Sequence, residues 1–488
     1  MPNYRILFCA SEAYPLIKTG GLADVAGSLP RALTKLKHDV RLVLPAYQSV
    51  MASLKTRPQL RYQTRIGDYP VGLLQTTLPG SRVPVWLVDC PPLFDRPGNP
   101  YHDAQGEPWP DNAQRFALFN QVIVRLANKQ FGMDWQPQVV HCNDWQTGLA
   151  PALLNEQPTR PATVFTIHNL AYQGMFDRAT FEQLQLPEHL WHHEQLEYHD
   201  GFAFIKGGLA FADRVNTVSP NYATEIQTPA FGHGMEGLLQ HRAARLSGII
   251  NGIDERTWNP GTDKLIAQTY NRQQLKKKLV NKQALQQHFK LDQQDDVFVM
   301  GMVSRLAEQK GIDLLIDILP QLMELPVQLV ILGSGDKENE QAMQEAADTY
   351  QGKMGVYLGY DENLAHQIEA GIDVFLMPSR FEPCGLNQMY SQRYGSLPVV
   401  TPVGGLSDTV IDASDENLKQ STATGFVMPE VSETALLQTL ERARQLYQAP
   451  AAWQKLQRSA MQADFSWANS AEAYGALYAL ALQDHPVA

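Results

Sequence analysis

Two loops in the second half of this 488-residue chain carry charged side chains just after an expected strand. Arg305 and Lys310 lie between a strand and a helix, and two cations there suit a diphosphate whose negative charge must be offset when it leaves. Glu382 follows another strand, where a carboxylate is suited to holding sugar hydroxyls or stabilising developing positive charge. A surface pair through Glu308 and a helix-capping acid explain the same residues without a site.

The loop after the first expected strand carries a lysine and two glycines. Lys18 supplies a positive charge on a flexible stem, while Gly20 and Gly21 let backbone N–H groups approach an anion at the start of a helix. The order of residues is not that of a P-loop, because G-x-x-x-x-G-K-[ST] is absent. The pattern fits a phosphate-binding turn and an ordinary strand-to-helix turn with a solvated lysine about equally well.

Polar side chains also end two further strands of the first half. Asp144 comes shortly after the run 139–142, and His168 and Asn169 directly follow the run 163–167. Open α/β sheets bind ligands at the carboxyl ends of their strands, so these side chains are candidates for a site. A histidine hydrogen-bonded within the core accounts for His168 equally well.

Other patterns fit metal, dinucleotide and disulfide sites poorly. The stretch 232–237 matches G-x-G-x-x-G, but no expected strand precedes it, so we reject a dinucleotide site there. The His and Glu residues of 192–199 lack the H-E-x-x-H order and fit the polar face of a helix better than a metal site. The four cysteines form no C-x-x-C pair, so we expect neither a zinc ribbon nor a disulfide framework.

The candidate residues need strands that end at one edge of a sheet, and the apolar pattern predicts such strands. Short β-rich runs alternate with helical stretches, which is typical of a parallel sheet covered on both faces. We therefore expect an α/β protein of two doubly wound, Rossmann-like domains joined in the turn-rich stretch 247–254. The expected strands span residues 4–10, 39–45, 83–90, 139–142, 163–167 and 214–218, and then 296–304, 327–332, 356–359, 372–377, 398–401 and 425–428.

Composition limits the class of protein. The 40 Lys and Arg against 51 Asp and Glu give a formal net charge of −11, which argues against a broad surface for nucleic acid or anionic lipid. Hydrophobic residues make up 44% of the chain, enough to fill large cores. The short apolar run 6–10 is too brief for a signal peptide, and no run reaches the length of a membrane span. We expect a cytoplasmic protein that binds neither nucleic acid nor membrane.

Taken together, several stretches resemble the bacterial glycogen synthases, the starch-synthase-like, ADP-glucose-dependent glycosyltransferases of family 5. The KTGGL segment is specific to this branch, whereas the Arg…Lys and Glu-Pro loops occur more widely among two-domain glycosyltransferases. The resemblance extends from the first strand to the last helix. It rests on the stretches 18–25 (KTGGLADV), 141–146 (HCNDWQ), 251–254 (NGID) and 382–386 (EPCGL), and on the pair Arg305 and Lys310.

The resemblance implies a GT-B architecture, in which two Rossmann-like domains face each other across a deep cleft. It assigns residues 1–247 to an acceptor-side domain and 248–462 to a donor-binding domain, and it implies that a helix over 463–488 crosses back to the first domain. The implied reaction transfers glucose from ADP-glucose to the non-reducing end of an α-1,4-glucan, glycogen or a malto-oligosaccharide, with retention at the anomeric carbon. No metal or other cofactor is implied.

The resemblance also implies a role for each candidate residue. Catalysis falls to Glu382, His168, Lys18, Arg305 and Lys310. The implied donor contacts are Lys18, Gly20, Gly21, Arg305 and Lys310 at the phosphates, Glu382 and Asn251 at the glucose, Cys384, Gly385 and Leu386 near the donor oxygens, and Tyr360 at the adenine. The implied sugar and acceptor residues are His168, Asn169 and Asp144, with Glu12 and Asp24 shaping the acceptor loop.

The sequence departs from the wider pattern at two positions. Related retaining transferases often carry a second glutamate eight residues after the first, where this chain has Tyr390, and the starch-synthase-like branch tolerates that change. Asn387 stands where threonine is commoner, so its contact with the donor is left open. Spacing alone does not exclude a UDP-glucose-dependent transferase, a GT-B-like sugar-nucleotide epimerase or a non-catalytic glucan-binding protein. It does not give the oligomeric state.

Overall fold

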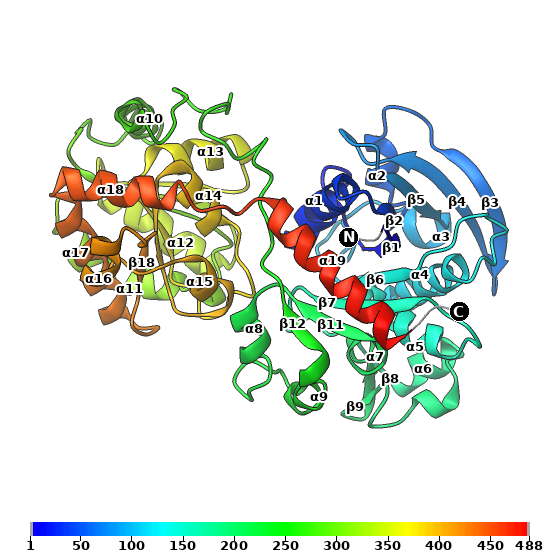
Figure 1. Ribbon diagram of the computed structural model, residues 1–488. Helices are drawn as coiled ribbons and strands as arrows, with labels where there is room; N and C mark the ends of the chain where they lie inside the picture. The colour runs from blue at the N-terminus through cyan, green and yellow to red at the C-terminus, as the bar shows by residue number, and fades with distance from the viewer. Residues whose placement is uncertain (1–2, 486–488) are drawn as a thin grey trace. The chain divides into compact units, whose positions relative to one another are not determined.

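The computed structural model describes residues 3–485, and these residues form two compact units, both drawn in Figure 1. The first unit comprises the described residues up to Gly252 together with those from Trp467 onward. The second unit comprises Ile253–Ser466. The chain therefore leaves the first unit once and returns to it for its last helix.

These bounds differ slightly from those expected from the sequence. The break after Gly252 falls in the predicted turn-rich stretch, a few residues later than the expected end at 247. The last helix, α19 (Trp467–Asp484), begins a few residues after the expected start at 463 and belongs to the first unit. The outermost parts of the expected segments, residues 1–2 and 486–488, lie outside the described residues.

Parallel strands form the centre of the first unit. The strands of its main sheet are β1 (Arg5–Cys9), β2 (Asp39–Pro45), β3 (Gln59–Ile66), β4 (Tyr69–Thr77), β5 (Pro84–Asp89), β6 (Val139–Asn143), β7 (Ala162–Ile167), β11 (Arg214–Thr217) and β12 (Leu246–Gly248). Within the described residues they make one nine-stranded sheet in the order β12-β11-β7-β6-β1-β2-β5-β4-β3. Pairing is parallel from β12 to β5 and antiparallel at β4 and β3. The strands β6 and β7 are buried throughout, as expected for parallel strands covered on both faces.

Helices and a small second sheet complete the first unit. The helices are α1 (Gly21–Lys35), α2 (Gln48–Ser53), α3 (Pro91–Phe94), α4 (Asn112–Ala127), α5 (Leu149–Asn155), α6 (Arg178–Gln183), α7 (Phe204–Phe211), α8 (Pro220–Glu225), α9 (Glu236–His241) and α19. The small sheet consists of β8 (Met175–Asp177), β9 (Glu197–Tyr198) and β10 (Gly201–Ala203). Helix α19, red in Figure 1, lies against α1, β6, β7 and β11. Its Tyr478 hydroxyl is hydrogen-bonded to Nδ1 of His141 at 2.8 Å, which ties the helix to the sheet.

Several parts of the first unit differ from the prediction, including β12 and the small sheet, which no expected strand covered. The antiparallel strands β3 and β4 were not predicted, and β3 lies at the edge of the sheet with most of its residues exposed. The stretch 192–199 is not a helix face: it forms turns and leads into β9, so its histidines do not share a helical side. The rejected G-x-G-x-x-G stretch follows α8 and a turn rather than a strand, which confirms that it is no dinucleotide fingerprint.

The second unit is a Rossmann-like domain in its strand order. Its strands are β13 (Phe298–Val303), β14 (Val327–Gly333), β15 (Met354–Leu358), β16 (Val374–Met377), β17 (Leu397–Val400) and β18 (Phe426–Val427). Among the described residues they form one parallel sheet in the order β15-β14-β13-β16-β17-β18, which is the 3-2-1-4-5-6 order of dinucleotide-binding folds.

Helices cover both faces of this sheet, and each face has its own hydrophobic core. The helices are α10 (Lys278–His288), α11 (Ile312–Leu322), α12 (Lys337–Thr349), α13 (Glu362–Gly371), α14 (Asn387–Tyr394), α15 (Gly404–Thr409), α16 (Asp415–Gln420), α17 (Glu433–Tyr447) and α18 (Pro450–Ala460). One core packs Met300 with side chains of α11, α17 and α18, and the other packs Val299 with side chains of α10 and α13. Successive residues of β13 thus point to opposite faces, as a strand requires.

Each sheet has one place where the winding of the chain reverses. In the first unit this switch point lies between β1 and β6, and in the second it lies between β13 and β16. Loops at the carboxyl ends of these strands form the usual ligand site of open α/β sheets, because neighbouring connections leave in opposite directions there. Most of the candidate residues lie on these four loops. Among residues 3–485, no helix is both long enough and apolar enough to cross a membrane.

Candidate active site

In the second unit, the loops after β13 and β16 are held together by a cation and a carboxylate. The Lys310 ammonium donates to a carboxylate oxygen of Glu382, and the Ser379 hydroxyl lies 3.4 Å from the same oxygen. The Glu382 side chain is 10% exposed and that of Lys310 is 17% exposed, so the ion pair is largely withdrawn from water. The fold thus joins two candidate residues that lie far apart in the sequence.

Backbone contacts fix these two loops against each other. The Gln309 side chain donates to the Phe381 carbonyl at 3.0 Å, and the Arg380 amide donates to the Gln309 carbonyl at 2.9 Å. The Arg380 guanidinium also forms a bidentate pair with Asp313, with one contact at 2.7 Å. Arg305 is exposed and donates to the Gln309 side chain at 3.1 Å. The two loops therefore form one preorganised edge, with Arg305 at its solvent side.

Glycines allow the close approach of backbone around Glu382. Gly311 has φ +70°, and an added Cβ there would lie 2.1 Å from the carbonyl oxygen of Pro378. An added Cβ on Gly405 would lie 2.3 Å from the Cys384 carbonyl oxygen, while the Gly405 amide donates to the Glu382 carbonyl at 3.1 Å. Neither position has room for a side chain without moving the loop, so these glycines help to place the carboxylate.

The remaining candidates of the second unit differ in their surroundings. Cys384 is buried, whereas Tyr360 is 75% exposed and its hydroxyl donates to Glu362 at 3.2 Å. The Asn387 side chain donates to the Val303 carbonyl at 2.7 Å, which gives it a role in holding the end of β13. Tyr390 stacks on Trp258 with ring centroids 4.0 Å apart, so this position braces the core instead of supplying a second carboxylate.

In the first unit, the loop after β1 is organised around a buried carboxylate. Glu12 is 3% exposed, and it accepts hydrogen bonds from the Thr19 amide, the Thr19 hydroxyl at 2.9 Å and the Gly20 amide at 3.2 Å. The Tyr101 hydroxyl donates to the same carboxylate at 3.0 Å. Glu12 therefore holds the turn that carries Lys18.

The same contacts engage the amide of one of the two glycines that were expected to meet a phosphate. Because the Gly20 amide already donates to Glu12, Gly21 at the first position of α1 becomes the candidate amide for an anion. Lys18 pairs with Asp24 in the first turn of α1 at 3.0 Å, and its side chain is 37% exposed. The Asp24 carboxylate therefore binds the Lys18 ammonium, and an anion that approaches this loop has to compete with Asp24 for it.

The loops after β6 and β7 are joined by a carboxylate in an unusual backbone conformation. Asp144 has φ +57°, a region that residues other than glycine rarely adopt and that often marks functional sites. Its carboxylate accepts the His168 amide at 2.7 Å. Burial raises the pKa of Asp144 to about 7, against the opposing effect of backbone N–H groups of His168 and Asn169. Burial lowers the pKa of His168 to about 3, so its imidazole is neutral at physiological pH.

Two asparagines complete the candidate set of this unit. The Asn169 side chain accepts the Ala171 amide at 3.0 Å and so holds the turn that follows β7. Asn251 is 5% exposed, and its Oδ1 has no hydrogen-bond partner within residues 3–485. An orphaned buried acceptor of this kind is costly unless a bound molecule satisfies it. Asn251 is therefore suited to receiving a hydrogen bond from a ligand hydroxyl.

Replacing Asp144 by asparagine is expected to raise the free energy of unfolding more at pH 8 than at pH 5. The pKa of about 7 lies above the ordinary 3.8, so the carboxyl stabilises the fold fully below pH 3.8 and loses that contribution as pH rises through 7. Asparagine carries no charge and tolerates positive φ, so we expect a gain of about 1–2 kcal/mol at pH 8. Urea unfolding at both pH values measures this difference, and an equal change at the two would contradict it.

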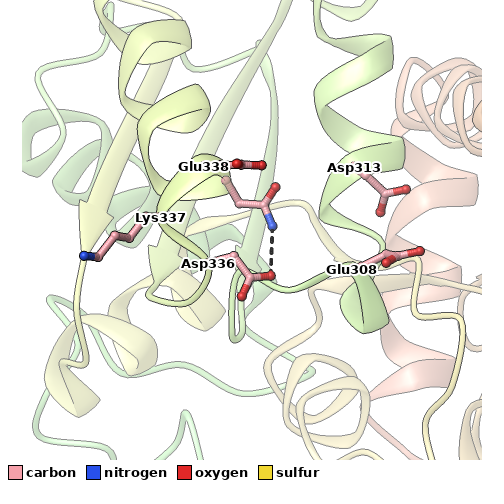
Figure 2. A pocket seen from close by; sticks show the side chains of 6 residues that line it. Glu308, Asp313, Asp336, Lys337 and Glu338 are labelled. Atoms are coloured by element: carbon pink, nitrogen blue, oxygen red, sulfur yellow. Dashed lines mark hydrogen bonds between the residues drawn. The ribbon is translucent and has the colours of Figure 1, made fainter. Parts of the chain in front are cut away.

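One pocket of the second unit contains none of the candidate residues. It has a volume of about 550 Å³ and is lined by Glu308, Asp313, Asp336, Lys337, Glu338 and Asn339, as Figure 2 shows. Its side chains are mostly acidic, which disfavours a phosphate. Across residues 3–485, no group of three or more His, Cys, Asp or Glu side chains is arranged to hold a metal ion.

Sequence reasoning missed two residues that organise the first unit. Tyr101 approaches Glu12 from a long loop without regular structure, and no local pattern marks it. Asn143, the last residue of β6, is fully buried and contacts His168 through Nε2 at 2.9 Å. A polar residue that ends a strand one position before Asp144 was a usable signal.

Two Rossmann-like units, with a cation–carboxylate pair at the switch point of the second, define a two-domain glycosyltransferase of the GT-B class. Family models agree with this division: residues 5–241 match the starch synthase catalytic domain, and residues 283–459 match the glycosyl transferases group 1. The catalytic domain of starch synthase IV from Arabidopsis thaliana, solved with ADP and acarbose, superimposes with a TM-score of 0.87 at 30% identity, covering 99% of this chain and 100% of that one.

Curated relatives narrow the class further. Glycogen synthase 1 of Methylococcus capsulatus is 54% identical over 478 residues, which cover 98% of this chain and 97% of that protein. Glycogen synthase of Cellvibrio japonicus is 54% identical over 481 residues, with 98% and 99% covered. The chain belongs to the glycogen synthase family, and it is a glycosyltransferase.

Proposed function

We propose that the chain transfers glucose from ADP-glucose to the non-reducing end of an α-1,4-glucan, with retention at the anomeric carbon and without a metal. The observation that carries this proposal is the pair of Lys310 and Glu382 at the switch point of the second unit. It sets a cation for a departing diphosphate beside a carboxylate for a sugar. The complex of starch synthase IV with ADP and acarbose supports a nucleotide-sugar donor and a glucan acceptor.

The proposed chemistry at this pair needs no strong general acid, because a nucleoside diphosphate is already a good leaving group. The bond from the anomeric carbon to the diphosphate oxygen breaks, and Lys310 and Arg305 offset the charge that collects on that oxygen. Glu382 holds the glucose hydroxyls while the ring passes through an oxocarbenium-like state. The acceptor hydroxyl attacks the same face, and its proton passes to the departing phosphate.

Residues of the first unit are proposed to complete the reaction. Lys18 and the Gly21 amide at the start of α1 contribute to phosphate binding. His168 and Asn251 accept hydrogen bonds from glucose hydroxyls, and Asp144 and Asn169 act on the acceptor side. In the second unit, Tyr360 offers an exposed ring for the adenine, and the amides of 384–386 lie near donor oxygens in this proposal.

Replacing Lys18 by alanine is expected to raise the Michaelis constant for ADP-glucose about tenfold and to leave the fold intact. The side chain is more than a third exposed and forms an ion pair with Asp24, so we expect its loss to cost a charge contact with phosphate rather than core packing. Initial rates at varied donor concentration, with circular dichroism as the folding control, measure this. An unchanged donor Michaelis constant and rate would remove Lys18 from the site.

A donor-by-acceptor activity matrix tests the proposed function itself. ADP-glucose and UDP-glucose are each offered with glycogen, with a malto-oligosaccharide and with no acceptor, and nucleotide release is measured with and without a chelator. We expect acceptor-dependent ADP release that the chelator does not change. Faster turnover of UDP-glucose would overturn the donor, and turnover without acceptor would favour an epimerase. Glucan binding without turnover of either donor would favour a binding protein.

A further inference from the structure

The imidazole of His168 meets a side chain that the proposed reaction does not yet use. Asn143 ends β6, is fully buried, and its Oδ1 lies 2.9 Å from Nε2 of His168. His168 is partly exposed, and within the described residues no group is hydrogen-bonded to its Nδ1. One ring nitrogen is therefore held by the protein, and the other is left for a ligand.

The contacts of Asn143 decide which ring nitrogen carries the proton. Its Nδ2 donates to the Cys9 carbonyl at 2.9 Å and lies 3.4 Å from the His141 carbonyl. Carbonyl oxygens only accept hydrogen bonds, so this end of the side chain must be the amide nitrogen. The other end is then the oxygen, which also only accepts, and Nε2 of His168 must be the donor.

We propose that Asn143 is a positioning residue for glucose transfer: it holds His168 as the Nε2–H tautomer, so that Nδ1 accepts a hydrogen bond from a hydroxyl of the bound glucose. The inference rests on the proposed role of His168 at the glucose. A ring protonated at Nδ1, or at both nitrogens, presents a donor at that place. A hydroxyl that has to donate there then loses its acceptor, and the site loses a hydrogen bond that fixes the sugar.

The charges around His168 favour the neutral ring. Burial lowers the pKa of His168 to about 3. From the loop after β6, the Asp144 carboxylate accepts the His168 backbone amide, and burial raises the pKa of this carboxyl to about 7. His141 on β6 is itself neutral, with its pKa lowered to about 3 mainly by burial, and Glu12 acts on Asp144 from the loop after β1. Among residues 3–485, no carboxylate is hydrogen-bonded to the ring, and the Asn143 amide oxygen is the partner of Nε2.

Nuclear magnetic resonance of the whole protein with ¹⁵N-labelled histidine tests the tautomer directly. The signals of His168 are assigned by their loss in His168→Gln. We expect a protonated Nε2 and a bare Nδ1 that do not titrate between about pH 6 and pH 8. Protonation at Nδ1, or titration near the ordinary histidine value, would overturn the inference. This measurement does not require activity. An inactive wild-type protein would contradict the proposed function, but the tautomer of His168 could still be measured.

The variant Asn143→Asp puts a carboxylate next to Nε2 of His168, where the wild-type protein has the Asn143 amide. It should raise the pKa of His168 into the measurable range, because an opposite charge next to the ring favours the cation. We expect kcat/KM at pH 7 to fall about tenfold and to recover as the pH rises past the new His168 value. Ring signals that stay as in the wild type would contradict the proposal. So would a titrating ring with an unchanged pH profile of transfer, since Asn143 would then not act on the reaction.

Two further variants separate positioning from folding. Asn216 is fully buried on β11 and donates to the Tyr474 hydroxyl at 3.1 Å, so Asn216→Asp introduces the same buried charge without touching His168. It should leave the His168 signals and the shape of the pH profile as in the wild type. If Asn143→Asp does not fold, Asn143→Ala removes the fixed acceptor, and His168 should then show a mixture of both tautomers. A single, unchanged tautomer in Asn143→Ala would overturn the proposal.

Discussion

Glucose transfer is expected to fall about 10³-fold when Glu382 is replaced by glutamine, near the upper end for removing one preorganised electrostatic group. The carboxylate is 10% exposed and is held by Lys310 and by the loop contacts around it, so it needs no reorganisation when the sugar develops positive charge. Glutamine keeps the shape and the capacity for one hydrogen bond but not the charge. The loss should therefore appear in kcat more than in the donor Michaelis constant.

The same substitution should strengthen the binding of ADP. In the wild-type protein the Lys310 ammonium donates to Glu382, and a diphosphate has to compete with that carboxylate. Removing one negative charge close to an anion is worth on the order of 1.4 kcal/mol at a partly buried site, which corresponds to about tenfold tighter binding. Calorimetric titration with ADP measures this, and initial rates with ADP-glucose and glycogen measure the loss of transfer.

A matched control is available on the same unit. Glu338 is an exposed carboxylate in the acidic pocket of Figure 2, so Glu338→Gln makes the same chemical change away from the pair. It should leave both the rate and ADP affinity as in the wild type. A Glu382→Gln protein that binds ADP more weakly would contradict the competition between carboxylate and diphosphate. One that retains most of its activity would remove Glu382 from the transition state.

The sequence predicted the central strands of both sheets because their pattern has a single physical cause. A strand buried on both faces, such as β6 or β14, has to be apolar along its length, and such runs are easily read. The edge strand β3 has one solvated face, so its QLRYQTRI segment lacks the continuous apolar run that marked the central strands. The position of the domain boundary was predicted less precisely. Turn residues mark a stretch of chain, but they do not mark the residue at which the chain passes from one unit to the other.

Parts of the site followed from topology, and parts did not. Strand ends at a switch point are determined by strand order, so Lys310 and Glu382 were predictable as neighbours once two Rossmann-like sheets were expected. The partners of a side chain depend on loops that approach from elsewhere. The contact of Tyr101 with Glu12 joins residues 89 positions apart, and no local pattern encodes it. The donation of the Gly20 amide to Glu12 lies within one loop, but it depends on how that loop folds back on itself, which the residue types alone do not determine.

Replacing Lys310 by methionine is the second change expected to have a large effect, and it should reduce both rate and stability. The cation that offsets the departing diphosphate is lost, which lowers kcat/KM by about 10²–10³-fold. Glu382 is also left buried without its partner, and breaking a buried ion pair from one side costs about 3–5 kcal/mol. The exposed Arg305 cannot replace the lost contact, because the Gln309 side chain already accepts from it on the solvent side of the loop.

The double variant Lys310→Met with Glu382→Gln separates the two effects. Without a buried charge on either side, the double variant should regain much of the stability lost in Lys310→Met, while its transfer rate stays as low as that of the worse single variant. Urea unfolding and initial rates on the four proteins complete the cycle, and Lys337→Met, on the exposed edge of the acidic pocket, is the control for losing a lysine. If the double variant lost rate by the product of the two single-variant reductions, the cation and the carboxylate would act at separate places. If the two residues serve one site for diphosphate and sugar, the double variant should be no slower than the worse single variant and should regain stability relative to Lys310→Met.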